Sequence, residues 1–101
     1  MPTQIIPAKT WTQITTGDAT AISFQNQSRI SQSHPDLTLG IVKLKGTVDA
    51  TQPTDDDGAI EFLPGQALTT KYTLAELWPS GSFVRVWAYC ETKTKVFVDH
   101  A

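Results

Sequence analysis

The carboxylates of this chain lie closest together in one short run, Asp55-Asp56-Asp57, which Gly58 follows directly. A hard cation such as calcium takes several oxygen ligands from a loop of this kind. The spacing departs from a calcium-binding loop, however, because Pro53 stands at the first ligand position and Pro64 and Gly65 stand near the closing one. Asp and Gly also favour tight turns. We therefore interpret the run as a solvated turn and assign no metal site, and whether Asp55, Asp56 and Asp57 also bind a cation stays open.

The residues that could support nucleophilic or acid–base catalysis are few and scattered. Cys90 is the only cysteine, and His34 and His100 are the only histidines. An enzyme would need a pocket that joins Cys90 with His34 and Asp36, but Cys90 falls in an expected strand, where nothing stabilises a thiolate. Phosphate-binding glycine loops and the common hydrolase signatures are absent from the sequence. The sequence predicts a protein that is not an enzyme and needs no cofactor.

Charge and hydropathy exclude further classes of function. Only 18% of the 101 residues are charged and the formal net charge is -2, so a basic surface for nucleic acid or an anionic membrane is not expected. No apolar run has the length of about 20 residues that a membrane span needs, and no secretory signal is recognised at the start. A single cysteine excludes an internal disulfide. We expect synthesis in a reducing cytoplasm.

Large apolar side chains outside the expected core are the candidate binding residues. Trp87 lies within a strand and is expected in the core, whereas Trp11 and Trp78 each stand beside a chain break. Tryptophan is enriched in interface anchors, and its flat ring also stacks on sugars. Ile5 and Ile6, near the N-terminus, need an apolar partner. These four residues are the predicted interface, and a carbohydrate-binding module that uses Trp11 or Trp78 is the alternative.

The elements that must position these residues are short strands. Turn-forming residues divide the chain at nearly even spacing, and threonine, which favours a pleated surface, is abundant. This pattern predicts an all-β fold, a small antiparallel β-sandwich of about seven strands with at most one short helical turn. Residues 1–9 are interpreted as an N-terminal arm and residues 10–101 as a single domain. The expected strands are Thr10–Thr15, Ala19–Gln25, Leu37–Val48, Ala59–Leu63, Ala67–Tyr72, Phe83–Glu91 and Thr94–Asp99.

Four local predictions can be checked against a structure. In the second strand, Ile22 and Phe24 alternate with polar residues and should face the core. In the first strand either face could be buried. A change in the apolar phase of the third strand predicts a bulge or bend near Gly40. Thr73 to Trp78 should form one turn of helix that Thr73 caps.

The last two strands predict a C-terminal hairpin that turns around Thr92-Lys93. With a two-residue turn, Tyr89 would lie opposite Val96, and Trp87 opposite Val98. The turn lacks the Asn-Gly or Asp-Gly pair that favours such hairpins, so a longer loop and a shifted register stay open.

The order of these signals over about residues 10 to 99 resembles the small β-sandwich structural proteins of tailed phages and prophages. The matching segments are Trp11-Thr12-Gln13-Ile14, Pro53 through Ile60, Leu63 through Leu68, and Val86-Trp87-Ala88-Tyr89. The resemblance implies a virion protein that is made in the host cytoplasm and binds phage capsid or tail proteins. A head-decoration or capsid-stabilising subunit is the simplest such role, and a tail-fibre-associated module is the alternative. Low charge and apolar strand faces favour a homo-oligomer.

Overall fold

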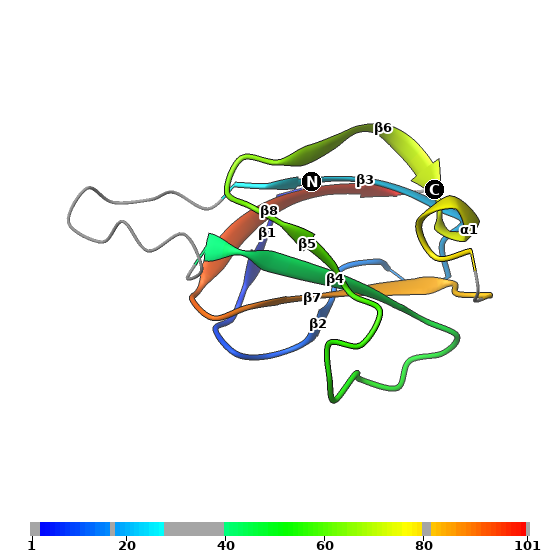
Figure 1. The fold of residues 1–101 in the computed structure, drawn as a ribbon, viewed down its shortest axis with the longest axis horizontal. Helices are drawn as coiled ribbons and strands as arrows, with labels where there is room; N and C mark the ends of the chain where they lie inside the picture. Colours follow the sequence, from blue (N-terminus) through cyan, green and yellow to red (C-terminus); the bar gives the residue numbers. More distant parts are fainter. Residues whose placement is uncertain (1–2, 17, 28–39, 80–81, 101) are drawn as a thin grey trace.

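The computed structural model describes residues 3–16, 18–27, 40–79 and 82–100, and within them the chain forms two stacked antiparallel sheets (Figure 1). We call the sheet with strand order β1-β8-β3-β6 the β8 sheet, and the sheet with order β2-β7-β4-β5 the β7 sheet. The predicted all-β sandwich is confirmed. Its elements are β1 (Thr3–Ile6), β2 (Thr12–Gln13), β3 (Ala21–Asn26), β4 (Val42–Thr47), β5 (Ile60–Phe62), β6 (Ala67–Thr73), α1 (Leu74–Leu77), β7 (Arg85–Cys90) and β8 (Thr94–His100).

Strict alternation in the central strands builds the core between the two sheets. On β3, Ile22 and Phe24 point inward as predicted, and on β4 Val42 and Leu44 do the same from the other sheet. The ring of Phe24 meets that of Phe62 at a centroid distance of 4.9 Å, edge to face. The two apolar faces therefore bury each other, as expected in a sandwich.

Asn26 is a buried polar residue that links the two sheets. Its side-chain amide donates hydrogen bonds to the carbonyl oxygens of Gly40 at 2.7 Å and of Phe62 at 2.8 Å. Asn26 also opens an Asn-Gln-Ser glycosylation sequon, but a fully buried amide with these partners is not accessible to a glycan-transferring enzyme.

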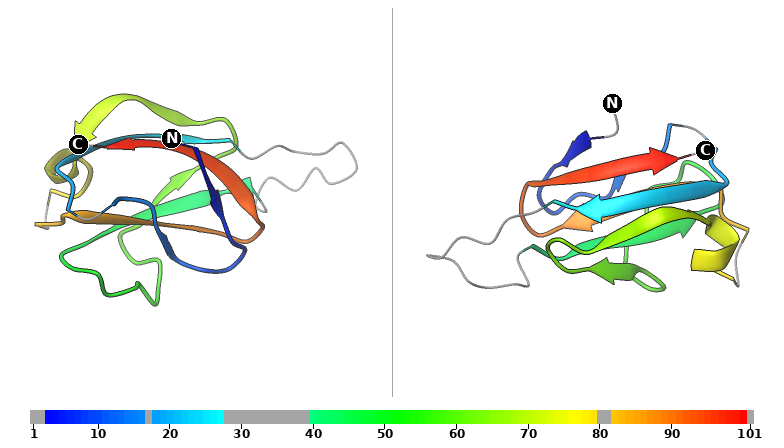
Figure 2. Two further views of the ribbon diagram at one scale, coloured as in Figure 1. Left: turned by 180° about the vertical axis from the view of Figure 1, so that it is seen from behind. Right: turned by 90° about the horizontal axis from the view of Figure 1, so that it is seen from above.

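Residues 3–6 form strand β1, which the sequence did not predict. The strand pairs with β8, at the opposite end of the chain, and Figure 2 shows it at one edge of the β8 sheet. Ile6 is fully buried in the core, whereas Ile5, which faces outward, is 61% exposed. The core is thus the partner of Ile6, and Ile5 has no comparable cover among the described residues.

The predicted C-terminal hairpin is wrong, because β7 and β8 belong to different sheets. Residues 91–93 carry the chain from one layer to the other, so Tyr89 does not pair with Val96, nor Trp87 with Val98. The inward faces of the two strands instead face each other across the core, and the Cys90 sulfur lies 3.2 Å from the Thr94 hydroxyl. Facing layers bury both apolar faces, whereas a hairpin within one sheet would place them side by side.

The short helix α1 is confirmed. The Thr73 hydroxyl accepts a hydrogen bond from the Glu76 amide at 3.1 Å, and the Glu76 carboxylate accepts one from the Thr73 amide at 2.9 Å. The Thr73 amide and the Thr73 hydroxyl both donate to the Glu76 carboxylate, and these two bonds lower the pKa of the Glu76 carboxyl below its ordinary value. The helix closes one end of the sandwich with Leu74 and Trp78, both of which are buried (Figure 1).

The bend predicted near Gly40 concerns residues that lie largely outside the described ranges. Strand β4 begins at Val42, after Gly40, and Leu37 and Leu39 are not described. A register shift is present elsewhere, between Ile22 and Phe24 where β3 pairs with β6.

Candidate binding groove

A groove of about 530 Å³ lies on the outer face of the β7 sheet. Its floor comes from β4 and β7, and its walls come from residues 9–11 and from the loop of residues 48–59. Figure 1 shows both wall segments on the side of the β7 sheet that faces away from the β8 sheet. We call this hollow the Trp11 groove.

Two aromatic rings and an amide define the centre of the Trp11 groove. Tyr89 and Lys43 are cross-strand partners on β7 and β4, and alternation turns both side chains outward. The Trp11 ring packs on the Tyr89 ring at a centroid distance of 5.3 Å and an interplanar angle of 40°. The side-chain amide of Gln52 donates a 2.7 Å hydrogen bond to the Trp11 carbonyl and so joins the two walls. The rings are therefore held in place by the fold.

Two ion pairs fasten the loop of residues 48–59 to β4. The Lys43 ammonium lies 2.8 Å from the Asp56 carboxylate, and Lys45 pairs with Asp55 in the same way. The hydrogen bonds from the lysines lower the pKa of the Asp55 and Asp56 carboxyls, and the bond to Asp56 raises the pKa of Lys43. Gly58, with a φ of 75°, completes the turn in the left-handed region.

This geometry agrees with interpreting the acidic run as a turn. Two of its three carboxylates, those of Asp55 and Asp56, already have a lysine partner. Among the residues that the structure describes, no three His, Cys, Asp or Glu side chains gather in a way that could hold a metal ion.

Three polar groups that line the Trp11 groove have no hydrogen-bond or ion-pair partner among the described residues. They are the Lys9 ammonium, the Tyr89 hydroxyl and the Glu91 carboxylate. Lys9 has a φ of 56°, a conformation that non-glycine residues seldom adopt, and its backbone amide donates a 2.8 Å hydrogen bond to the Cys90 carbonyl. Strained residues of this kind often mark binding sites.

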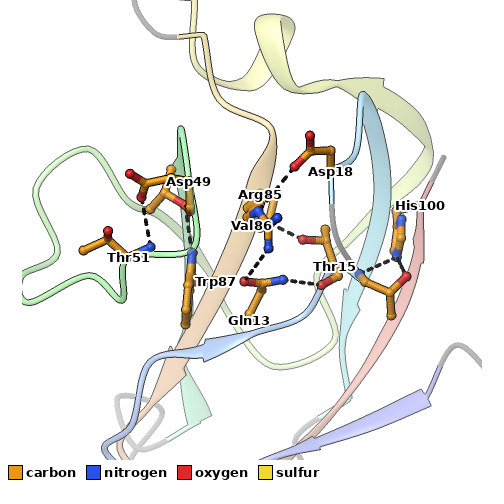
Figure 3. Close-up of polar contacts among 11 residues, drawn as sticks. Gln13, Thr15, Asp18, Asp49, Thr51, Arg85, Val86, Trp87 and His100 are labelled. Atoms are coloured by element: carbon orange, nitrogen blue, oxygen red, sulfur yellow. Dashed lines mark hydrogen bonds and ion pairs between the residues drawn. The ribbon is translucent and has the colours of Figure 1, made fainter.

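A second polar cluster lies beyond the groove, and its side chains contact one another (Figure 3), although the buried Arg85 Nε has an ion pair and no hydrogen bond among the described residues. Arg85 forms an ion pair with Asp18 at 3.3 Å and donates a hydrogen bond to the Gln13 side chain at 3.4 Å. Gln13 in turn donates to the Thr15 carbonyl. Ile14 and Thr15 are both buried, so strict alternation fails next to the two-residue strand β2. This cluster joins β2 to β7 and leaves little for a ligand.

His100 on β8 contacts Thr16, in the segment that follows β2. Its Nε2 accepts a hydrogen bond of 3.1 Å from the Thr16 backbone amide, as Figure 3 shows. The histidine therefore has a structural role in the fold.

The candidate residues that the sequence analysis identified lie in environments that differ from one residue to the next. Trp11 lines the groove but is only 9% exposed, and Ile5 is exposed on the opposite sheet. Trp78 is 6% exposed, and its indole N–H donates a 2.9 Å hydrogen bond to the Gly58 carbonyl, so little of it is left for a partner. Cys90 is buried in the core, and His34 and Asp36 lie outside the described residues.

Sequence reasoning missed Tyr89, Gln52 and Lys43 as groove residues. The alternation of Lys43 and Lys45 does place both lysines on one face of a strand, which is the one sequence signal for this surface. Nothing in the sequence pairs Tyr89 with Trp11, because that contact joins two distant segments.

Comparison with protein-family models, with curated proteins and with solved structures found no match for this chain. Among the described residues, no helix is long and apolar enough to cross a membrane.

Proposed function

We propose that this protein is a non-enzymatic structural subunit of a tailed-phage virion, which binds the repetitive capsid lattice as a head-decoration or stabilising protein. The resemblance in its sequence signals supports this role, and so does the small β-sandwich fold. The observation that carries the proposal is the exposed Ile5 at the edge of the β8 sheet, which pairs with Lys95 and lies next to an uncharged row.

That row crosses all four strands of the β8 sheet. Thr3 pairs with Phe97, Phe97 with Gln25, and Gln25 with Ala67, so none of the four positions carries a charge. We call these four residues together with Ile5 the docking row. The outer face of a sheet in a monomer normally carries polar and charged side chains. The exposed Ile5, the half-buried Phe97 and their uncharged neighbours form the least polar part of this face, which is where a partner protein would gain most by covering it.

The edge position of β1 favours the same use. One side of β1 bonds to β8, and the other side has no neighbouring strand among the described residues. Open edges can accept a strand from a partner. The docking row and this edge together offer a lattice protein both apolar contact and backbone hydrogen bonds, and the repeated sites of a lattice would hold many copies.

Purified variants test this surface. Ile5→Ser should weaken binding to capsid shells that lack the protein by roughly thirtyfold, since burying an isoleucine contributes about 2 kcal/mol. Val48→Ser is a matched control, because Val48 is 60% exposed but lies in the loop on the other sheet. Co-sedimentation with capsid shells measures the binding of both variants. Equal binding of Ile5→Ser and the unaltered protein would remove the docking row from the proposal, and failure of the unaltered protein to bind would contradict the proposal itself.

A further inference from the structure

We propose that the Trp11 groove binds a short neutral oligosaccharide. This function is separate from lattice binding, because the groove lies on the β7 sheet and the docking row lies on the β8 sheet. A subunit held by one sheet would present the other sheet, and the groove with it, to the surroundings of the particle.

The size of the groove suits a ligand of a few sugar rings. Its volume of about 530 Å³ falls within the range of about 300–1,000 Å³ that small-ligand sites occupy. The groove is open to solvent rather than enclosed, so a chain of sugars that binds there can extend beyond it. All the residues that line it belong to the described part of the chain.

The aromatic pair provides the apolar contact that sugars require. Tyr89 is only half-buried, and the Trp11 ring supports it from one side at 5.3 Å. The electron-rich face of an aromatic ring attracts the weakly positive C–H groups on one face of a sugar ring. Because Trp11 and Gln52 already fix this arrangement, little ordering is needed when a ligand binds.

The charges of the groove compensate one another, which favours a neutral ligand. Asp56 is paired with Lys43, and Asp55 with Lys45. The remaining charged groups, Lys9 and Glu91, have opposite signs. An anionic polymer would need a surplus of positive charge, which this surface does not have.

The unpaired polar groups match the hydroxyl groups of a sugar. Each hydroxyl both donates and accepts hydrogen bonds. In the groove, the Lys9 ammonium can donate, the Glu91 carboxylate can accept, and the Tyr89 hydroxyl can do either. Gln52 donates to Trp11 through its nitrogen, which leaves its side-chain oxygen as a further acceptor.

Direct titration tests the site with defined probes. Cellotriose, maltotriose and chitotriose are added to the purified protein while the indole and tyrosine NMR signals are recorded, and a glycan array extends the search. We expect saturable binding of at least one neutral glycan, with shifts at Trp11 and Tyr89 and little change in affinity at high salt. Absence of binding to every neutral glycan overturns the inference. Binding of anionic glycans alone, lost at high salt, also overturns it.

Two variants locate the binding. Tyr89→Ala removes the stacking face and should weaken binding tenfold or more, whereas Tyr72→Ala, at a tyrosine 38% exposed on the edge strand β6, should leave binding unchanged. Thr54→Trp fills the groove from an exposed loop position and should abolish binding without disturbing the core. If Tyr89→Ala and Thr54→Trp both keep full affinity, the groove is not the site. Ile5→Ser should keep full glycan affinity, so failure of lattice docking and failure of glycan binding are distinguishable.

Discussion

The side-chain amide of Asn26 on β3 donates a 2.8 Å hydrogen bond to the backbone carbonyl of Phe62 on β5, and this bond ties the β8 sheet to the β7 sheet. A second bond from the same amide reaches the Gly40 carbonyl. One buried side chain thus forms both of these bonds between the layers, so the residue should be important to the sandwich.

Asn26→Ala should lower the free energy of unfolding by about 2–3 kcal/mol, because it removes the donor to the buried Phe62 carbonyl and a second bond to the part-buried Gly40 carbonyl. Chemical denaturation measures the change. Ser23→Ala, on the outer face of the same strand, is the control and should change stability by less than about 0.5 kcal/mol. A loss at Asn26 no larger than that of the control would contradict the role of the amide as a link between sheets.

Gly46→Ala should also destabilise the fold. A Cβ at this position would lie 2.6 Å from Cδ2 and 2.9 Å from Cγ of Phe83, so the aromatic ring would have to move. Overpacking of this kind costs about 1–3 kcal/mol. In a double-mutant cycle with Phe83→Ala, the added methyl group should cost much less once the ring is gone. Additive costs in that cycle would show that Phe83 is not what excludes a side chain at residue 46.

The ion pairs at Lys43 and Lys45 should make the loop of residues 48–59 sensitive to acid. The folded-state pKa values of Asp55 and Asp56 lie below the ordinary value of 3.8, so the pairs stabilise the loop fully above that pH. Their contribution is lost as the pH falls below 3.8 through the folded-state values. Hydrogen-exchange protection of the backbone amides in residues 52–57, corrected for the intrinsic rate at each pH, should fall there, before the core strands open.

Variants separate this effect from general acid unfolding. Replacing Lys43 and Lys45 together with Met should make exchange in the loop fast already at neutral pH and remove the acid-dependent step. Lys71→Met, which removes the exposed pair with Asp99 at 3.4 Å on the β8 sheet, should leave the loop unchanged. An acid step that persists in the double variant would show that other groups control the loop.

Lys9→Gly should stabilise the protein by about 0.5–1 kcal/mol, because glycine adopts the φ of 56° found at this position without the clash that a Cβ introduces. Lys93→Gly, at an exposed position with an ordinary φ, should not stabilise it and serves as the control. Thermal denaturation of both variants measures the difference. Equal destabilisation by the two glycines would show that Lys9 carries no strain.

The parts of the fold that local patterns control were predictable from the sequence. Alternation places Ile22 and Phe24 in the core, and the Thr73 and Glu76 pair begins α1. Both depend only on neighbouring residues. The all-β class likewise follows from evenly spaced turn residues, and all seven expected strands have a counterpart in the structure.

Contacts between distant segments were not predictable in this way. Strand β1 forms because residues 3–6 pair with β8, nearly a hundred residues away, and no periodicity in four residues signals that. The chain passes from the β7 sheet to the β8 sheet after β7 because the apolar faces of β7 and β8 cover each other across the core, and a local pattern cannot show which surface will cover a strand. The groove depends on the meeting of Trp11 with Tyr89, so the sequence marked Trp11 as a candidate without indicating its partner.

Counting this protein in purified particles tests its proposed role as a virion subunit most directly. Particles released from cells that carry the gene are purified on a density gradient and analysed by quantitative mass spectrometry, with the major capsid protein as the internal reference. A head-decoration role predicts many copies per particle, in a constant ratio to the capsid protein. Particles that contain none of it, while the protein accumulates free in the same cells, would contradict that role.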